Sequence, residues 1–136
     1  EEAATTSRAT ARPRGGPPAT SGRAGVLPVA RFNARLERAG GAWARSPLAV
    51  AARFLGRDRL DVYMTSVATL ERRDGRDRVV VTTTIARARD DSISAIRYVL
   101  ALESRPGGRW RLRSARFTQR CAPGRGHQAF SADPCL

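Results

Sequence analysis

The segment SISAIRYVLALESRPGGRWRLRSARFTQRC (residues 92–121) decides the fold, because it contains two strand patterns separated by a turn. In its first half, apolar side chains recur at every second position, at Ile96, Tyr98, Leu100 and Leu102. Pro106-Gly107-Gly108 indicates a turn. In the second half, we expect Trp110 and Leu112 on one face and Arg111, Arg113 and Phe117 on the other. This alternation predicts an antiparallel hairpin with one face against a core.

Two further strand patterns precede this hairpin. RLDVYMTSVATLERR (residues 59–73) has a period of two, with Leu60, Val62 and Met64 on one face. Asp74-Gly75 is a hairpin signal, and the following segment RDRVVVTTTIARA (residues 76–88) is rich in β-branched residues that favour a strand. Asp90-Asp91 ends this strand. Residues 59–121 therefore predict four antiparallel strands joined by short turns.

The chain before Gly56 has helical spacing instead. Apolar residues recur three and four positions apart at Val29, Phe32 and Leu36, which predicts a helix from Pro28 to Gly40-Gly41. A second helix is expected over residues 46–55, with Ser46 as its N-cap. Trp43, between the two helices, is expected to fill the core.

The domain organisation follows from where apolar residues begin. Residues 1–25 contain no Val, Ile, Leu, Met or aromatic residue, which predicts a disordered Pro/Gly/Thr/Arg-rich tail or linker. Residues 26–136 then form a single domain. Helices followed by a meander predict an α+β fold, with one or two N-terminal helices packed on a four-stranded antiparallel meander and a disulfide-closed C-terminal loop. The other face of the sheet is expected to be open to solvent or to a partner.

Two resemblances add to this prediction. The order of elements over residues 26–120 resembles the cystatin-like and nuclear-transport-factor-like folds, in which a curved antiparallel sheet wraps an N-terminal helix. The C-terminal segment is similar to the end of a family of small, uncharacterised bacterial proteins that are exported or membrane-anchored. The matching residues are Gly108, Trp110, Cys121, Gly124 to Gln128, Ser131 and Cys135, with Phe130 as a nearby aromatic. The resemblance implies a compartment and a fold, and it implies no activity.

The segment CAPGRGHQAFSADPC (residues 121–135) contains both cysteines and the only histidine. We favour a disulfide between Cys121 and Cys135, which the chain-entropy model values at about 3 kcal/mol for a loop of about 15 residues. Two cysteines with none left over are typical of an oxidising compartment. The residues expected to shape the loop are Gly124, Gly126, His127 and Phe130, with His127 bonded to a backbone carbonyl and Phe130 folded back to the domain edge.

Two other interpretations of this segment compete with the disulfide. Cys121, His127 and Cys135 offer three metal ligands, with Asp133 as a fourth, but zinc sites usually pair their ligands at shorter spacing. Cys121 with His127 as a base would make a nucleophile, but no residue is recognisable that would orient the pair. We therefore expect no metal, no cofactor and no catalytic residue.

The charge of the chain indicates the kind of partner. Its formal net charge is +13, and all of its basic residues are arginines. Guanidinium groups are always charged and their forked donors suit carboxylate and phosphate. A basic sheet face is therefore expected to bind an anion or partner. The candidate residues are Arg97, Arg109, Arg111, Arg113, Arg116, Arg120 and Arg125.

These features favour a non-catalytic extracytoplasmic module, acting as an accessory or binding domain. It would be tethered through its N-terminal linker, after a removed signal peptide or an anchor, in a membrane-associated complex. Its partner would be an acidic protein surface or an anionic envelope component. An alternative is a nucleic-acid-binding protein that uses the Arg-rich sheet face, although only Phe117 is expected there to stack on bases. A third hypothesis is a small-ligand carrier or enzyme with a pocket lined by Thr83 or Tyr98.

Overall fold

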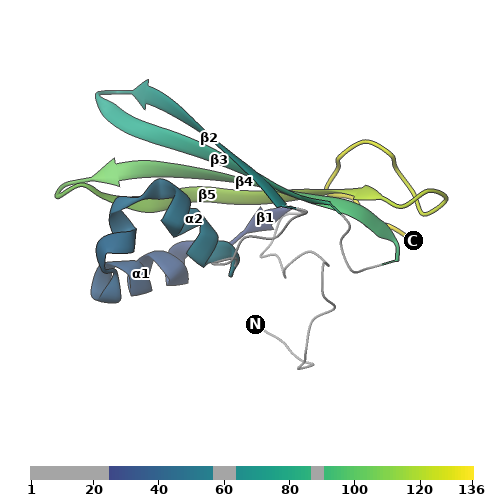
Figure 1. Ribbon diagram of the computed structural model, residues 1–136, viewed down its shortest axis with the longest axis horizontal. Coiled ribbons are helices and arrows are strands. Elements are labelled where there is room, and N and C mark those ends of the chain that lie inside the picture. The colour runs from purple at the N-terminus through teal and green to yellow at the C-terminus, as the bar shows by residue number, and fades with distance from the viewer. Residues whose placement is uncertain (1–24, 57–63, 87–90) are drawn as a thin grey trace.

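The computed structural model describes residues 25–56, 64–86 and 91–136, which form two helices packed on one face of a five-stranded antiparallel sheet (Figure 1). The predicted α+β class is confirmed. Three expectations lie outside the described residues, namely the tail before Gly25, the strand start at Leu60 and Val62, and the strand end at Asp90.

The helices lie close to where the capping residues predicted them. α1 (Ala30–Ala39) begins two residues after Pro28, and α2 (Pro47–Leu55) begins directly after its N-cap, Ser46. The Ser46 side chain accepts a hydrogen bond from the Ala49 N–H at 3.2 Å. The short 3₁₀ helix η1 (Ala42–Arg45) carries Trp43, which is partly buried against the core and lies 6.3 Å from Phe32 between ring centroids. The expected role of Trp43 in the core is confirmed.

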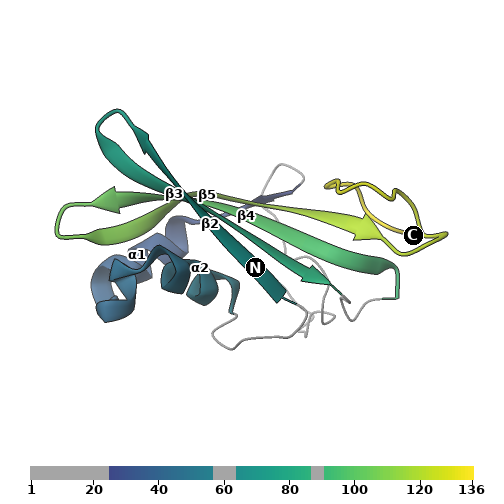
Figure 2. The ribbon, with the colours of Figure 1, turned by 45° about the horizontal axis from the view of Figure 1, so that its top comes forward.

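The sheet has the strand order β1-β5-β4-β3-β2, and every neighbouring pair is antiparallel. The predicted meander is formed by β2 (Met64–Arg73), β3 (Arg76–Ala86), β4 (Ile93–Arg105) and β5 (Arg109–Cys121). The two-residue strand β1 (Val26–Leu27) was not predicted, and it pairs with the outer side of β5. Both hairpin turns lie at one end of the sheet and the C-terminal loop lies at the other (Figures 1 and 2).

The core lies between the helices and the sheet face that they cover. Its fully buried side chains include Val50 of α2 and Leu100 and Leu102 of β4. Asn33 of α1 fixes the helix to the edge of β5, because its side chain donates to the Leu112 carbonyl at 2.9 Å and accepts from the Leu112 N–H at 3.1 Å. The Asn33 amide thus pairs with β5 as a strand residue would, beyond the point where β1 ends.

A β-bulge in β5 corrects the predicted position of Phe117. Leu102 pairs with Leu112 and Ala101 pairs with Ser114, so that Arg113 has no partner in the register. One extra residue in a strand turns every later side chain to the opposite face. Phe117 was expected beside Arg111 and Arg113, but it is buried in the core beside Tyr98 on β4.

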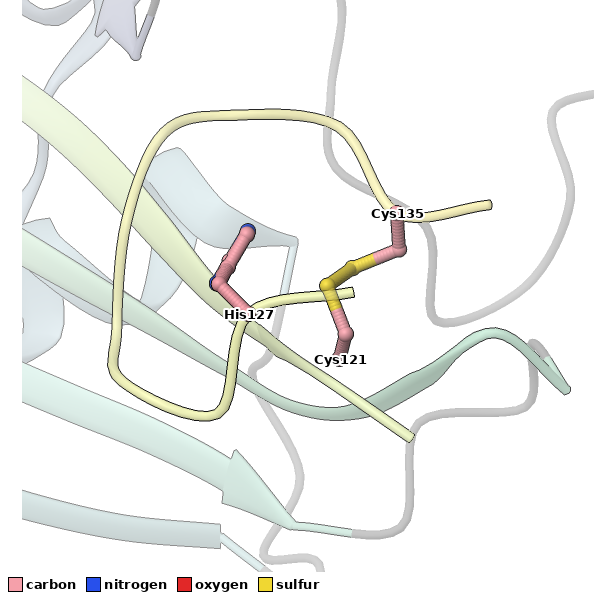
Figure 3. Close-up of side chains that lie close together, drawn as sticks. All are labelled: Cys121, His127 and Cys135. Atoms are coloured by element: carbon pink, nitrogen blue, oxygen red, sulfur yellow. A yellow bond between two sulfur atoms is a disulfide. The ribbon is translucent and has the colours of Figure 1, made fainter. Parts of the chain in front are cut away.

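The C-terminal loop is closed by the predicted disulfide between Cys121 and Cys135 (Figure 3). His127 lies within this loop, and both of its ring nitrogens face backbone carbonyl oxygens. The Nδ1 atom is 2.7 Å from the Ala129 oxygen, and the Nε2 atom is 2.9 Å from the Asp133 oxygen. These two carbonyls raise the pKa of His127, the Asp133 carbonyl most, because they favour the protonated ring that donates to both.

Glycine is required at one position of this loop. Gly126 has a φ of +136°, and a Cβ atom there would lie 2.9 Å from the Cys121 sulfur. Gly124 also has a positive φ, of 77°. The expected roles of these glycines in shaping the loop are consistent with these backbone angles.

Candidate anion-binding site

An open cleft of about 580 Å³ lies on the sheet face opposite the helices, which we call the open face. Its position follows from the register, since Glu103 of β4 lies between Arg78 of β3 and Arg111 of β5. The next residue of β4, Leu102, points to the core instead. The cleft, named here the arginine cleft, is lined by Asp74, Arg76, Arg78, Glu103, Arg111 and Arg113.

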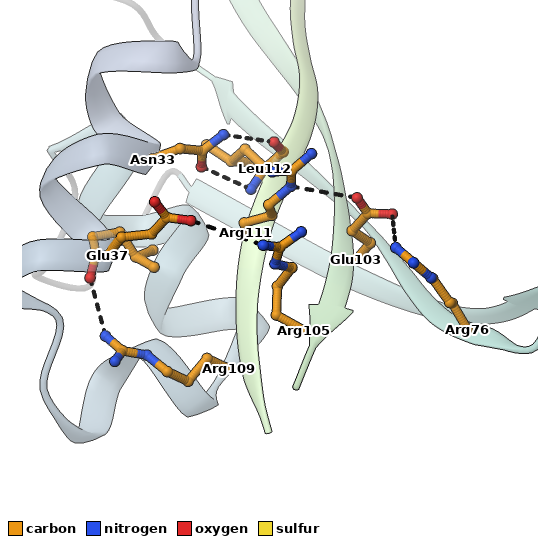
Figure 4. A network of polar contacts seen from close by, with 9 residues as sticks. Asn33, Glu37, Arg76, Glu103, Arg105, Arg109, Arg111 and Leu112 are labelled. Atoms are coloured by element: carbon orange, nitrogen blue, oxygen red, sulfur yellow. Dashed lines mark hydrogen bonds and ion pairs between the residues drawn. The ribbon is translucent and has the colours of Figure 1, made fainter. Parts of the chain in front are cut away.

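Glu103 forms the floor of the arginine cleft (Figure 4). One carboxylate oxygen lies 3.4 Å from Arg111 Nε. The other lies 3.9 Å from the Nη1 atom of Arg76 and also 3.9 Å from the Nη1 atom of Arg113. The Glu103 side chain is only 8% exposed, whereas those of Arg76, Arg111 and Arg113 are 59%, 38% and 42% exposed. The carboxylate is therefore covered by a rim of guanidinium groups that still reach solvent.

The arginine cleft contains more hydrogen-bond donor groups than acceptor groups. Four guanidinium groups and two carboxylates line it, which leaves a surplus of two positive charges. The Nε atoms of Arg78 and Arg111 are buried without a hydrogen-bond partner. The contacts of Glu103 are also longer than the roughly 2.7–2.9 Å of a charge-assisted hydrogen bond. An anion that entered the cleft would bring the missing acceptor oxygens.

Arg111 and Arg113 were predicted as anion-binding residues, but their partners in the cleft were not. Arg76 and Arg78 alternate across Asp77 directly after the Asp74-Gly75 turn, which places them on one face of β3. Glu103 is the only acidic residue of β4. The alternating arginines of β3 and the single acidic residue of β4 were visible in the sequence. The pairing register was needed to show that these residues lie together.

Three of the other expected residues form a second basic group on the open face, nearer the C-terminal loop. The guanidinium carbons of Arg97 and Arg120 lie 3.9 Å and 5.4 Å from the centroid of the Phe130 ring. Such contacts are cation–π interactions. Phe130 therefore folds back over side chains of β4 and β5. Arg116 is exposed and lies across from Val99.

Two expected anion-binding residues have structural contacts instead. The Nη2 atom of Arg109 donates to the Leu36 carbonyl at 3.0 Å and to the Gly40 carbonyl at 2.8 Å. Figure 4 shows one of these contacts. A cation at the carboxyl end of α1 is favourable for the helix dipole. Arg125 contacts the backbone oxygen of Leu136 at 3.4 Å. The prediction that Arg109 belongs to the binding face is therefore corrected, because its side chain caps α1.

The structure brings together the three residues that were considered as metal ligands. Ligand atoms of Cys121, His127 and Cys135 lie within 4.8 Å of one another. The two sulfur atoms are bonded to each other, however, and both ring nitrogens of His127 are occupied by carbonyl oxygens. Thiolates are the metal ligands and the nucleophiles of cysteine chemistry. This geometry favours the disulfide over the metal and catalytic interpretations.

The hollow between α2 and the sheet is small. Thr83 lines it together with Leu48, Leu55 and Ser66, and its volume is about 30 Å³. This is the share of volume that one water molecule occupies in the liquid. The Thr83 hydroxyl is also paired with that of Ser66 at 2.8 Å. This hollow gives the small-ligand hypothesis no room for a substrate.

Comparisons with protein-family models, with curated proteins and with solved structures found no match to this chain. The resemblances to exported bacterial proteins and to the cystatin-like and nuclear-transport-factor-like folds therefore stay predictions. In the described segments, no helix has the length and apolar character to cross a membrane.

Proposed function

We propose that the protein is a non-catalytic binding module whose arginine cleft receives an acidic group of its partner. The surplus of guanidinium donors around Glu103, with two buried Nε atoms that make no hydrogen bond, carries this proposal. Guanidinium groups bind carboxylates and phosphates through pairs of parallel hydrogen bonds. A carboxylate or phosphate in the cleft would therefore gain strong bonds and would satisfy donors that Glu103 leaves unpaired.

The partner that fits is an acidic protein surface or an anionic envelope component, in a membrane-associated complex. Arg97 lies six residues from Glu103 along β4, which corresponds to about 20 Å in a strand. A partner with several anionic groups would therefore reach both the arginine cleft and the second basic group at Arg97, Arg116 and Arg120. The net charge of +13 would also speed its approach.

We assign the protein to an extracytoplasmic compartment, whether periplasmic, lumenal or at the cell surface. The disulfide between Cys121 and Cys135 supports this assignment, because such bonds persist in oxidising compartments. In this proposal, residues 1–25 tether the domain to the membrane, behind a removed signal peptide or an anchor.

Nucleic acid is the alternative partner, and the position of the aromatic residues disfavours it. Proteins that bind single strands stack successive bases on exposed aromatic rings. Phe117, the residue expected to do this, is buried in the core. Phe130 is instead engaged by Arg97 and Arg120. Among the residues that the structure describes, the open face therefore offers guanidinium groups without a free aromatic ring for stacking.

The test compares two charge-matched double variants. Arg78→Gln with Arg111→Gln removes two charges from the cleft, and Arg31→Gln with Arg38→Gln removes two from exposed positions on α1. Binding is measured to oligoglutamate, to phosphatidylglycerol vesicles and to a single-stranded oligonucleotide over a range of salt concentrations, after circular dichroism has verified folding.

We expect the cleft variant to bind oligoglutamate or the anionic vesicles about tenfold more weakly, and the α1 variant to change little. An equal loss in both variants would show that net charge alone drives binding, and the proposal would be wrong. If the protein binds the oligonucleotide more tightly than the other two ligands, and with the steepest salt dependence, nucleic acid would be supported as the partner instead.

A further inference from the structure

The outer edge of the sheet at β2 is incomplete in the part of the chain that the structure describes. β2 pairs with β3 over its whole length, from Met64 opposite Ile85 onward, and no described strand lies on its other side. Six successive residues, 65–70, are exposed, although Ser66 also lines the small hollow beside α2. Val67 and Leu70 are 57% and 69% exposed.

Between Met64 and Leu70, this edge lacks the features that usually protect an edge strand, and the charged residues of β2, Glu71, Arg72 and Arg73, lie at its hairpin end. Such strands are shortened, bent by a bulge, or interrupted by proline or inward-facing charge, because their unpaired backbone groups otherwise attract another chain. Met64–Leu70 contains neither proline nor a charged residue, and its register with β3 is uninterrupted. An uncharged and partly apolar stretch of edge strand of this kind is suited to receive another strand.

The hairpin geometry identifies the backbone groups that face outward. Asp74 and Gly75 both have positive φ angles, 52° and 74°, as in a two-residue type I′ turn. In such a hairpin the closing pair exchanges both hydrogen bonds, and bonded and non-bonded pairs then alternate along the strands. The N–H and C=O groups of Ser66, Ala68 and Leu70 are therefore directed away from β3.

A strand added at this edge would meet two different surfaces. On the open face, Arg78 of the arginine cleft lies one strand inward from β2, directly opposite Glu71 of β2. On the helix face, Leu48 of α2 is 48% exposed and lines the small hollow beside Ser66. Successive side chains of a strand point to opposite faces. A segment that alternates acidic with apolar residues would direct its acidic side chains toward the positive charge of the open face, beyond Glu71, and its apolar side chains toward Leu48 and Leu70 on the helix face.

We propose that an extended segment of a partner protein, in which acidic and apolar residues alternate, pairs with β2 as an additional strand. The inference rests on the proposed function, because the acidic side chains would lie toward the arginine cleft. A second copy of this chain is disfavoured as the occupant, since each copy carries a net charge of +13. The N-terminal tail is disfavoured because it is rich in proline, glycine and arginine.

The test uses the acetylated and amidated peptide Glu-Val-Glu-Val-Thr-Val-Glu-Val-Glu as the probe. Its control is Glu-Glu-Glu-Glu-Thr-Val-Val-Val-Val, which has the same composition and charge but no alternation. The variant Ala68→Pro removes one outward N–H group without removing a bond to β3, and Ala68→Ser is its matched control. Proline at such a position is tolerated on edge strands.

We expect the alternating peptide to bind the wild-type protein and Ala68→Ser equally, and Ala68→Pro at least fivefold more weakly. The control peptide should bind more weakly than the alternating peptide. Hydrogen exchange needs no variant, and the amides of Ser66, Ala68 and Leu70 should exchange at least tenfold more slowly when the alternating peptide is bound.

The two proposals fail in different ways. If oligoglutamate binding depends on Arg78 and Arg111 but peptide binding is insensitive to Ala68→Pro and to alternation, strand addition is wrong and the cleft proposal stands. If oligoglutamate binds equally well after Arg78 and Arg111 are replaced, the proposed function itself is wrong. Slow exchange of the same amides without peptide, together with self-association, would assign the edge to a second copy and overturn the inference.

Discussion

Replacement of Glu103 by glutamine would remove the internal counter-charge of the arginine cleft. Glutamine has nearly the same size and keeps one acceptor oxygen, so the change is electrostatic. It leaves Arg76, Arg111 and Arg113 around a neutral side chain that is only 8% exposed. We expect the variant to be less stable than the wild type and to bind anions more tightly, because a ligand would no longer compete with an internal carboxylate.

The magnitude follows from the geometry of the three ion pairs. Two unit charges about 4 Å apart interact by about 4 kcal/mol at an effective dielectric constant of about 20. The rim guanidinium groups are 38–59% exposed, however, and exposed pairs contribute about 0.2–1 kcal/mol each. The free energy of unfolding should therefore fall by about 1–3 kcal/mol, and Tm by roughly 4–12 °C for a domain of this size.

Thermal unfolding with and without sodium sulfate is the assay. Glu37→Gln is the matched control, because Glu37 is 61% exposed on α1 and its carboxylate lies 4.0 Å from Arg105. Sulfate should restore Tm in the Glu103 variant more than in the control, since a ligand of the folded state stabilises it by mass action. If both variants are equally stable and respond equally to sulfate, the charges of the cleft are not coupled and this reasoning is refuted.

Three further predictions concern the ends of the sheet. Replacing Cys121 and Cys135 by serine should lower the free energy of unfolding by about 3 kcal/mol in denaturant titrations. In the wild-type protein, the intact mass should show no alkylation of cysteine before reduction. The backbone carbonyl of Asp133, and to a smaller extent that of Ala129, raises the pKa of His127 from its ordinary value of 6.5. The resulting stabilisation is complete below about pH 6.5 and is lost as pH rises through the raised pKa, so His127→Gln should reduce Tm more at about pH 5.5 than at about pH 8.5. Asn33→Ala removes both side-chain bonds between α1 and β5 and should cost about 1–3 kcal/mol in the same titrations, whereas no loss would mean that the helix is held by apolar packing alone.

The sequence was sufficient to predict the elements whose signals are local. Alternation and β-branched residues located β3 and β4, and Ser46 with Pro47 located the start of α2. The disulfide was predictable because only two cysteines exist in the chain. Each of these predictions depends on neighbouring residues or on the number of cysteines. None of them depends on how distant segments pair.

The features that the sequence did not predict depend on pairing between segments. β1 is only two residues long, and it is a strand because it reaches β5. Glu103 lies beside Arg78 and Arg111 because of the register of three strands. Arg109 caps α1 across 73 positions of sequence, from β5 to the Leu36 carbonyl. No local pattern contains these contacts, since each requires the fold to exist first.

The bulge at Arg113 links the basic composition of β5 to its core. With strict alternation after Leu112, Arg116 and Arg120 would point into the core, and Phe117 would be exposed on the open face. The extra residue reverses this, so that Phe117 is buried and both arginines lie with Arg111 on the open face. A single local irregularity therefore satisfies the core and concentrates positive charge on one surface. A β-bulge that re-aims side chains in this way is common next to functional sites, and here it lies at the arginine cleft.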